Sequence, residues 1–263
     1  MKKNSCEYNV AFSSSGARFA AHVGVLAYLQ DNEIKVSNFS GTSGGAVVAA
    51  WGANNLSARK LLDITLRFGY AEFFIKPSLQ FGGIFDHSLF GEMVSSYCMP
   101  RKNLSIVSFN LLKMQKHIWT GENINLKKAI TASTCIPGLF KPVLHADGVH
   151  IDGIFASFCP DDIWESGQTI SVQLKCENKA KSRSRYPFDN FIHVIEKTAI
   201  NLFEVAQKWN NCKKDILYIQ PDVSLIAQTD FFAISPEDHI ELFRNGYEAA
   251  KYEMGRHSLL SAA

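Results

Sequence analysis

The sequence of 263 residues has few features of a metalloprotein or of a disulfide-rich secreted protein. Its six cysteines are scattered and contain no C-x-x-C pair, which fits reduced, buried thiols better than disulfides or a zinc site. None of the eight histidines stands in H-E-x-x-H or H-x-H spacing. We therefore expect no metal site and no bound cofactor.

Long apolar runs are also missing. No uncharged apolar run approaches the roughly 18 to 20 residues that a membrane-spanning helix needs. The start, Met1 to Glu7, turns polar at once and has no apolar stretch of a secretory signal. We therefore expect a cytoplasmic chain whose contact with membrane lipid is peripheral. The net charge of +2 is too close to balance to favour nucleic acid as a partner, and the oligomeric state stays open.

What is present favours one folded α/β domain. Hydrophobic residues make up 46% of the chain, enough for a substantial core. Strand candidates at 8–12 and 34–39 are each followed by a turn and an apolar helix candidate, at 17–30 and 44–53. Two such units in succession predict a parallel sheet covered by helices. The pattern further predicts helices at 56–68, from Ser88, at 125–134, at 189–209 and from Ser235, two strands in 103–121, a hairpin in 140–155 and strands at 169–174 and 215–220.

The first candidate for chemistry is Ser43, in the segment Gly41-Thr42-Ser43-Gly44-Gly45. This G-x-S-x-G lies between a strand and a helix candidate, which is the context of a nucleophile elbow. The sharp turn lifts the hydroxyl above the sheet edge, and the helix N-terminus favours developing negative charge. A glycine-rich turn with a capping serine is the alternative. The strand-turn-helix context favours the nucleophile.

A second strand-to-helix junction carries Ser14-Ser15-Gly16-Ala17-Arg18. Neighbouring strands of a parallel sheet would bring this turn beside Ser43, where its backbone N–H groups could face a carbonyl oxygen, as an oxyanion hole requires. A phosphate-binding turn or a plain helix cap explains the same residues equally well. The residues alone leave these readings open.

Together, these segments resemble the patatin-like phospholipase family. The family's motif G-G-G-x-[RK]-G before an apolar helix is similar to SSSGARFAAHVGVLAYL, its G-x-S-x-G to GTSGG, and its Asp-Gly-[Gly/Ala] motif to Asp152-Gly153. TASTCIPGLFKPV and DFFAISPEDHIELFRNGYEAA also resemble family segments. The likeness covers roughly residues 8 to 254 as a single domain, with short tails at 1–7 and 255–263.

The resemblance implies a three-layer α/β/α fold with a mostly parallel central sheet. It also implies a phospholipase A-type lipid acyl hydrolase acting on glycerophospholipids. In such an enzyme Ser43 would attack the ester carbonyl, Asp152 would take its proton as the general base, and an acyl-enzyme would form, without a metal or cofactor. The oxyanion hole would come from Ser15, Gly16, Ala17 and Arg18, with motif support from Gly41, Gly44, Gly45 and Gly153.

Several residues depart from the family pattern. Ser14 and Ser15 replace glycines, Phe19 replaces the glycine after Arg18, and Ile154 stands where a small residue is usual. A serine forced to a positive φ would be strained by roughly 1 to 2 kcal/mol, and loss of an oxyanion donor costs about 2.7 to 4 kcal/mol in the barrier. A catalytically weakened lipid-binding protein is therefore one alternative. Others are a Ser-Asp-His esterase with His193 or His239, and a CoA-dependent acyltransferase.

Two further segments bear on lipid contact. The stretch 68–94 is rich in aromatic residues, which would suit an acyl-chain groove or a lid, although core packing is the other reading. The basic stretch 175–187, KCENKAKSRSRYP, would suit anionic headgroups or a solvated loop.

Overall fold

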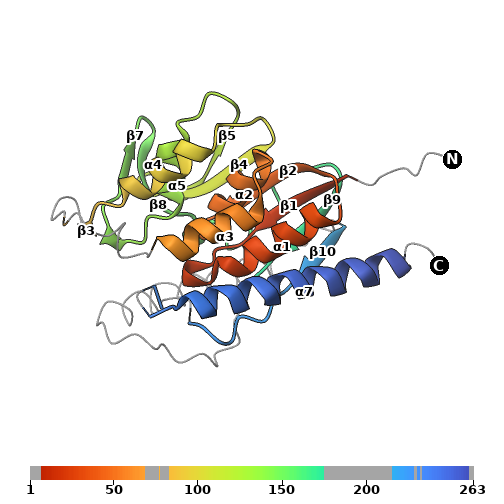
Figure 1. The fold of residues 1–263 in the computed structure, drawn as a ribbon. Coiled ribbons are helices and arrows are strands. Elements are labelled where there is room, and N and C mark those ends of the chain that lie inside the picture. The colour runs from red at the N-terminus through yellow and green to blue at the C-terminus, as the bar shows by residue number, and fades with distance from the viewer. Residues whose placement is uncertain are drawn as a thin grey trace.

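A computed structural model describes residues 7–68, 77, 83–174, 215–227, 230, 231 and 233–260. In this part of the chain one eight-stranded sheet is covered by helices (Figure 1). Its strand order is β10-β9-β1-β2-β4-β8-β7, and β5 pairs with β4. The strands are β1 (Tyr8–Phe12), β2 (Val36–Thr42), β4 (Leu104–Asn110), β5 (Gln115–Thr120), β7 (Val143–His145), β8 (Gly148–Asp152), β9 (Gln168–Val172) and β10 (Ile216–Ile219).

The five strands from β10 to β4 pair in parallel, while β5, β7 and β8 pair antiparallel. The predicted α/β architecture with a mostly parallel sheet is confirmed. The helices are α1 (Ala20–Asp31), α2 (Gly44–Ala53), α3 (Ala58–Arg67), α4 (Ser88–Tyr97), α5 (Leu126–Ser133) and α7 (Pro236–Leu260), with 3-10 turns η1 (Gly16–Arg18) and η3 (Gly153–Phe155).

The main core lies between the sheet and helices α1, α2 and α3. Its members include Val10 and Phe12 of β1 and Trp51 of α2, all fully buried. Helix α7 runs alongside α1 (Figure 1). The two backbones approach so closely that a Cβ on Gly24 would overlap the Phe243 carbonyl, so this pair of helices requires glycine.

A second hydrophobic cluster covers the opposite face of β1. Ala11, which alternates with Val10 and Phe12, packs with Ile154, Phe158 and Cys159 from η3 and the segment after it. The helix predicted over 189–209 lies outside the described residues. A second, two-stranded parallel sheet of β3 (Gly83–Phe85) and β6 (Gly138–Phe140) has no counterpart in the sequence prediction.

One edge of β4 is shared by two strands. β2 pairs with β4 up to the register Thr42↔Val107, and β8 takes over from Ser108↔Asp152, while β5 occupies the other edge over 105–110. Because β2 is parallel and β8 antiparallel to β4, the C-terminal ends of β2 and β8 meet. A Cβ on Gly153 would overlap the Val107 carbonyl, which shows how tight this junction is.

Candidate functional site

Ser43 forms the sharp turn between β2 and α2. Its backbone has φ 54° and ψ −127°, a conformation that costs a non-glycine residue of order 1–3 kcal/mol. Its N–H donates to Ser133 Oγ at the end of α5 (2.9 Å). A Cβ on Gly45 would overlap the carbonyl oxygens of Phe12 and Ser13. Gly45, the second residue after Ser43, is therefore needed for the close approach of the β1 turn to α2.

Asp152, at the end of β8, lies directly against Ser43. Ser43 Oγ donates to Asp152 Oδ2 at 2.8 Å, and the other carboxylate oxygen accepts from Ile154 N–H (2.9 Å). The Asp152 N–H donates to the Cys135 carbonyl (2.8 Å). Burial raises the pKa of Asp152 to about 7, although its hydrogen bonds from Ile154 and Ser43 oppose that rise.

In the turn after β1, the residue with a left-handed backbone conformation is Gly16. Gly16 has φ 55°, whereas neither Ser14 nor Ser15 has a positive φ, and Ser15 has φ −132°. The serines that replace family glycines therefore carry no left-handed strain. The N–H groups of Ser15, Gly16 and Ala17 have no hydrogen-bond acceptor among the described residues, and Gly16 lines the same cavity as Ser43.

Arg18 holds this turn in place. Its buried guanidinium donates from Nη2 to the Leu174 carbonyl just beyond β9 (3.2 Å) and from Nε to the Ser15 carbonyl (3.5 Å). Its backbone N–H also donates to the Ser15 carbonyl (3.2 Å). Of the four predicted oxyanion residues, Arg18 therefore differs from the other three in that its N–H is already bonded within the chain.

A mostly apolar cavity opens at Ser43. Its empty volume is about 870 Å³, part of which is open to solvent. Most of its walls are aliphatic and aromatic: Phe19, Val47, Leu61, Ile64, Phe68, Phe90, Met93, Ile136, Phe140 and Phe231. The polar or small lining residues are Gly16, Ser43, Gly44, Thr65, His87 and Thr134.

The aromatic stretch 68–94 contributes to this cavity only in part. Phe68 and Phe90 line it, while Phe85 packs against the cluster around Cys135 and Phe140. The remaining aromatic positions of the stretch, Tyr70, Phe73, Phe74 and Phe81, and the basic stretch 175–187 lie outside the described residues.

No histidine of the described chain forms a hydrogen bond with Ser43 Oγ or Asp152. His239 is buried on α7, its ring 6.3 Å from that of Phe19. His87 lines the cavity, but its Nε2 lies 2.9 Å from the Thr131 carbonyl, and burial lowers its pKa to about 4. His193 lies outside the described residues.

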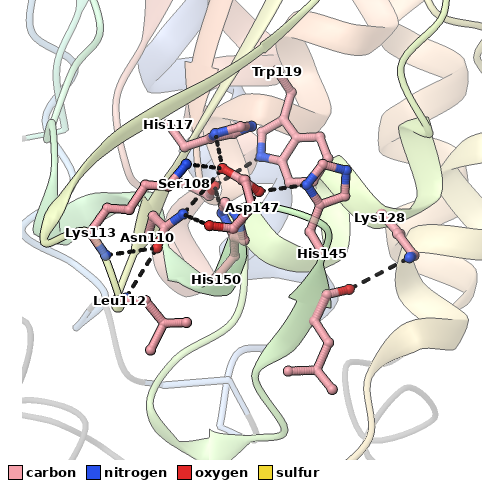
Figure 2. Close-up of polar contacts among 11 residues, drawn as sticks. Ser108, Asn110, Leu112, Lys113, His117, Trp119, Lys128, His145, Asp147 and His150 are labelled. Atoms are coloured by element: carbon pink, nitrogen blue, oxygen red, sulfur yellow. Dashed lines mark hydrogen bonds and ion pairs between the residues drawn. The ribbon is translucent and has the colours of Figure 1, made fainter.

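The sequence motifs did not reveal two groups of interacting residues that the structure shows. The first is Ser133, whose hydroxyl accepts a hydrogen bond from Ser43 N–H and which lies in the TASTC segment, where no motif marks it as functional. The second feature is a group of three histidines around one carboxylate, Asp147, in which His117, Asp147 and His150 have ligand atoms within 4.8 Å of one another (Figure 2). The expectation of no metal ligands rested on short-range motifs, and these residues come from separate strands.

Comparison with known proteins gives one family. A family model described as patatin-like phospholipase matches residues 10–163, more than half of the chain. Uncharacterized NTE family proteins of Mycobacterium bovis and Mycobacterium tuberculosis are each 25% identical over 258 residues, covering 84% of this chain and 43% of theirs. The chain therefore spans less than half the length of these curated relatives.

Solved structures share the fold. VipD from Legionella pneumophila aligns with a TM-score of 0.66 at 12% identity, over 96% of this chain and 67% of that one. The type III effector protein ExoU aligns with a TM-score of 0.53 at 12% identity, over 95% and 53%. As for membrane insertion, none of the helices in the described residues has the length and apolarity to cross a bilayer.

Proposed function

Because the chain belongs to the patatin-like phospholipase family, we propose that it is a lipid acyl hydrolase that cleaves fatty acyl esters of glycerophospholipids. The observation that carries this proposal is the 2.8 Å hydrogen bond from Ser43 Oγ, which lines a mostly apolar cavity, to the buried Asp152 carboxylate. A hydroxyl, a base and an apolar binding space are the parts that hydrolysis of a fatty ester requires.

In the proposed reaction Ser43 Oγ attacks the ester carbonyl while Asp152 Oδ2 accepts its proton. The raised pKa of Asp152, about 7, makes it a stronger base than an exposed aspartate. Collapse of the tetrahedral intermediate releases the lysolipid alcohol, which takes the proton back from Asp152, and leaves Ser43 acylated. Water, activated by the same carboxylate, then releases the fatty acid.

The oxyanion of the intermediate needs donors that are already in place. We assign this role to the N–H groups of Gly16 and its neighbours Ser15 and Ala17, since they have no acceptor in the described chain. Arg18 acts through them as a positioning residue, because its guanidinium joins the Ser15 carbonyl to the end of β9. The N-terminus of α2 behind Ser43 adds a favourable dipole.

Purified protein incubated with vesicles of mixed glycerophospholipids tests the proposal. Release of fatty acid and lysolipid by the parent chain, and its loss in Ser43→Ala and Asp152→Asn, is the expected result. Ser96→Ala on α4 and the exposed Asp162→Asn are matched controls that change the same residue types away from the cavity. Both controls should retain full activity.

Other results would change the assignment. Transfer of the acyl group to an added alcohol or thiol acceptor faster than to water would make the protein an acyltransferase. Lipid binding without labelling of Ser43 by a fluorophosphonate would make it a lipid-binding protein. Full hydrolysis by Asp152→Asn would exclude the aspartate as the base.

A further inference from the structure

Outside the cavity, the described part of the chain holds a cluster of polar side chains around Asp147, in the turn between β7 and β8 (Figure 2). Three imidazoles approach its carboxylate from three different strands. Asp147 Oδ1 lies 2.6 Å from His145 Nδ1 and 2.9 Å from His150 Nε2, and Oδ2 lies 3.1 Å from His117 Nδ1.

From this arrangement we infer that His117, His145, Asp147 and His150 form a binding site for one divalent transition-metal ion, with zinc as the best match. Three imidazole nitrogens and one carboxylate oxygen make a four-coordinate set that zinc accepts. Calcium and magnesium prefer sets made of oxygen atoms alone, so the donor chemistry disfavours them.

Tetrahedral coordination by all four residues requires the side chains to move, His145 the most, because only His117, Asp147 and His150 have ligand atoms within 4.8 Å of one another. Zinc bonds to nitrogen and oxygen of about 2.0–2.2 Å place neighbouring ligand atoms roughly 3.3 Å apart. The imidazole–carboxylate distances of 2.6–3.1 Å therefore have to open by roughly 0.2 to 0.7 Å. His117, His145 and Asp147 are all partly exposed, at 24%, 33% and 24% of their side-chain surface, which leaves them room to move.

The residues behind the ligands already orient them. His150 is fully buried, and its second ring nitrogen, Nδ1, lies 2.9 Å from Ser108 Oγ, so that Nε2 faces the cluster. Trp119 Nε1 donates to the same hydroxyl (2.8 Å). Asn110 Nδ2 donates to the Asp147 carboxylate (3.1 Å). Partners of this kind on the far side of histidine and carboxylate ligands are typical of metal sites.

One charged side chain beside the cluster has to move when a cation binds. Lys113 Nζ, 3.6 Å from Asp147 Oδ2, would be repelled by a metal ion. Its side chain is 48% exposed and its ion pair is weak, so it can turn into solvent at little cost.

The site is separate from the proposed hydrolase chemistry, but one strand joins the two. His150 and Asp152 both belong to β8 and have only Ile151 between them. A metal ion bound to His117, His145 and His150 would tie β5, β7 and β8 together. We therefore expect the bound ion to stabilise β8, the strand that carries Asp152.

Metal titration of the untagged, chelator-treated full chain tests the site. We expect one equivalent of Zn²⁺ to bind in competition with a micromolar chelating dye, and to raise the thermal unfolding midpoint by several degrees. Co²⁺ should give the intense visible bands of a tetrahedral site without a thiolate charge-transfer band, which separates this cluster from the cysteines.

Variants of the proposed metal ligands test where the ion binds. His117→Gln and Asp147→Asn should each weaken Zn²⁺ binding at least tenfold and abolish the Co²⁺ bands. His257→Gln on α7 is the matched histidine control and should bind like the parent. Both ligand variants change partly exposed side chains, so they keep the test valid even if His150→Gln does not fold. Equal affinity in Asp147→Asn and the parent, or no uptake by the parent, would overturn the inference.

Discussion

Ser43 Oγ and Asp152 Oδ2 are 2.8 Å apart although 109 positions separate the two residues in the sequence. They meet because β2 and β8 share one edge of β4 and point their C-terminal ends at each other. Each residue is also anchored to the segment at the end of α5, Ser43 through Ser133 and Asp152 through the Cys135 carbonyl. The relative position of the proposed nucleophile and base is thus set by backbone pairing and by these two hydrogen bonds.

Removal of either partner should abolish hydrolysis without unfolding the chain. We expect Asp152→Asn to lower kcat/KM by about 10²–10⁴-fold, the usual contribution of a general base, and Ser43→Ala to lower it at least as much. Because the two groups act as a unit, the double variant should be no worse than Ser43→Ala alone. Steady-state kinetics on a soluble fatty ester measures all three. Losses in the two single variants that multiply in the double variant would argue against a shared step.

The pH dependence of kcat/KM should follow the Asp152 carboxyl group. The carboxylate is the basic form, and burial raises its pKa to about 7. Activity should therefore fall about tenfold per pH unit below pH 7 and become level above it. A profile of kcat/KM from pH 5 to pH 9 checks this prediction. A profile still level at pH 5 would mean that Asp152 is not the titrating base.

The same raised pKa predicts a cost in stability. Between about pH 4 and pH 7 the unfolded chain has lost a proton that folded Asp152 retains, so this group's contribution to stability falls as pH rises through that window. Asp152→Asn removes the effect. The variant should therefore gain stability relative to the parent between pH 4 and pH 7 and keep that gain at pH 8.

Urea unfolding at pH 5 and at pH 8 measures this difference, and the exposed Asp162→Asn is the control that should show no comparable gain. An Asp152→Asn variant that is less stable than the parent at pH 8 would contradict the proposed cost of burying the charge.

Local patterns were sufficient for much of this fold. The apolar run after the serine motif predicted a helix at 44–53, which is α2 as observed. The motif order predicted the family, and the family match confirms it. The strand predicted at β2 ends too early, at Phe39, because Gly41 is a poor strand former and the polar Ser40 and Thr42 interrupt the apolar run. Pairing with β4 holds them in the strand and buries them.

Relations between distant segments could not be predicted in this way. Ser133 interacts with Ser43 only because α5 ends beside β2, and the histidines around Asp147 converge from β5, β7 and β8. His145, Asp147 and His150 do stand within six consecutive residues, but this spacing matches none of the metal motifs that were sought, and His117 joins them only through the pairing of strands. At Ser14 and Ser15 the sequence suggested a problem that the structure does not show. Comparison with the glycine pattern suggested backbone strain at these serines, but the residue in the left-handed conformation is Gly16.

Ser133 should therefore matter for the position of Ser43. Ser133→Ala leaves the buried Ser43 N–H without its acceptor, which costs about 1–3 kcal/mol. We expect lower stability together with a reduced kcat, while fluorophosphonate still labels Ser43 slowly. Chemical unfolding and labelling rates measure both effects, with Ser96→Ala as the exposed serine control. Labelling at the parent rate would show that the turn keeps its shape without this bond.

Substitutions of Gly16 and Ser15, in the loop that faces Ser43, should have different effects on activity. Gly16→Ala forces a side chain into φ 55°, which costs roughly 1–2 kcal/mol, and it should displace the proposed oxyanion donors. Ser15→Gly should not raise activity, because Ser15 carries no left-handed strain. Gly255→Ala, in the open on α7, is the control and should gain up to about 1 kcal/mol. Higher kcat in Ser15→Gly would show that the serine impairs the loop.

Phe19 should set which acyl chains the proposed enzyme accepts. It stands where the family pattern has glycine, lines the cavity, and lies so close to the elbow that a Cβ on Gly44 would be 3.3 Å from its own Cβ. Phe19→Ala opens space next to Ser43, so the ratio of kcat/KM for long or branched esters to that for short esters should rise about tenfold or more. Phe109→Ala, which removes a ring packed on Phe155 outside the cavity, is the control. If both variants leave the chain-length profile unchanged, the acyl chain binds elsewhere.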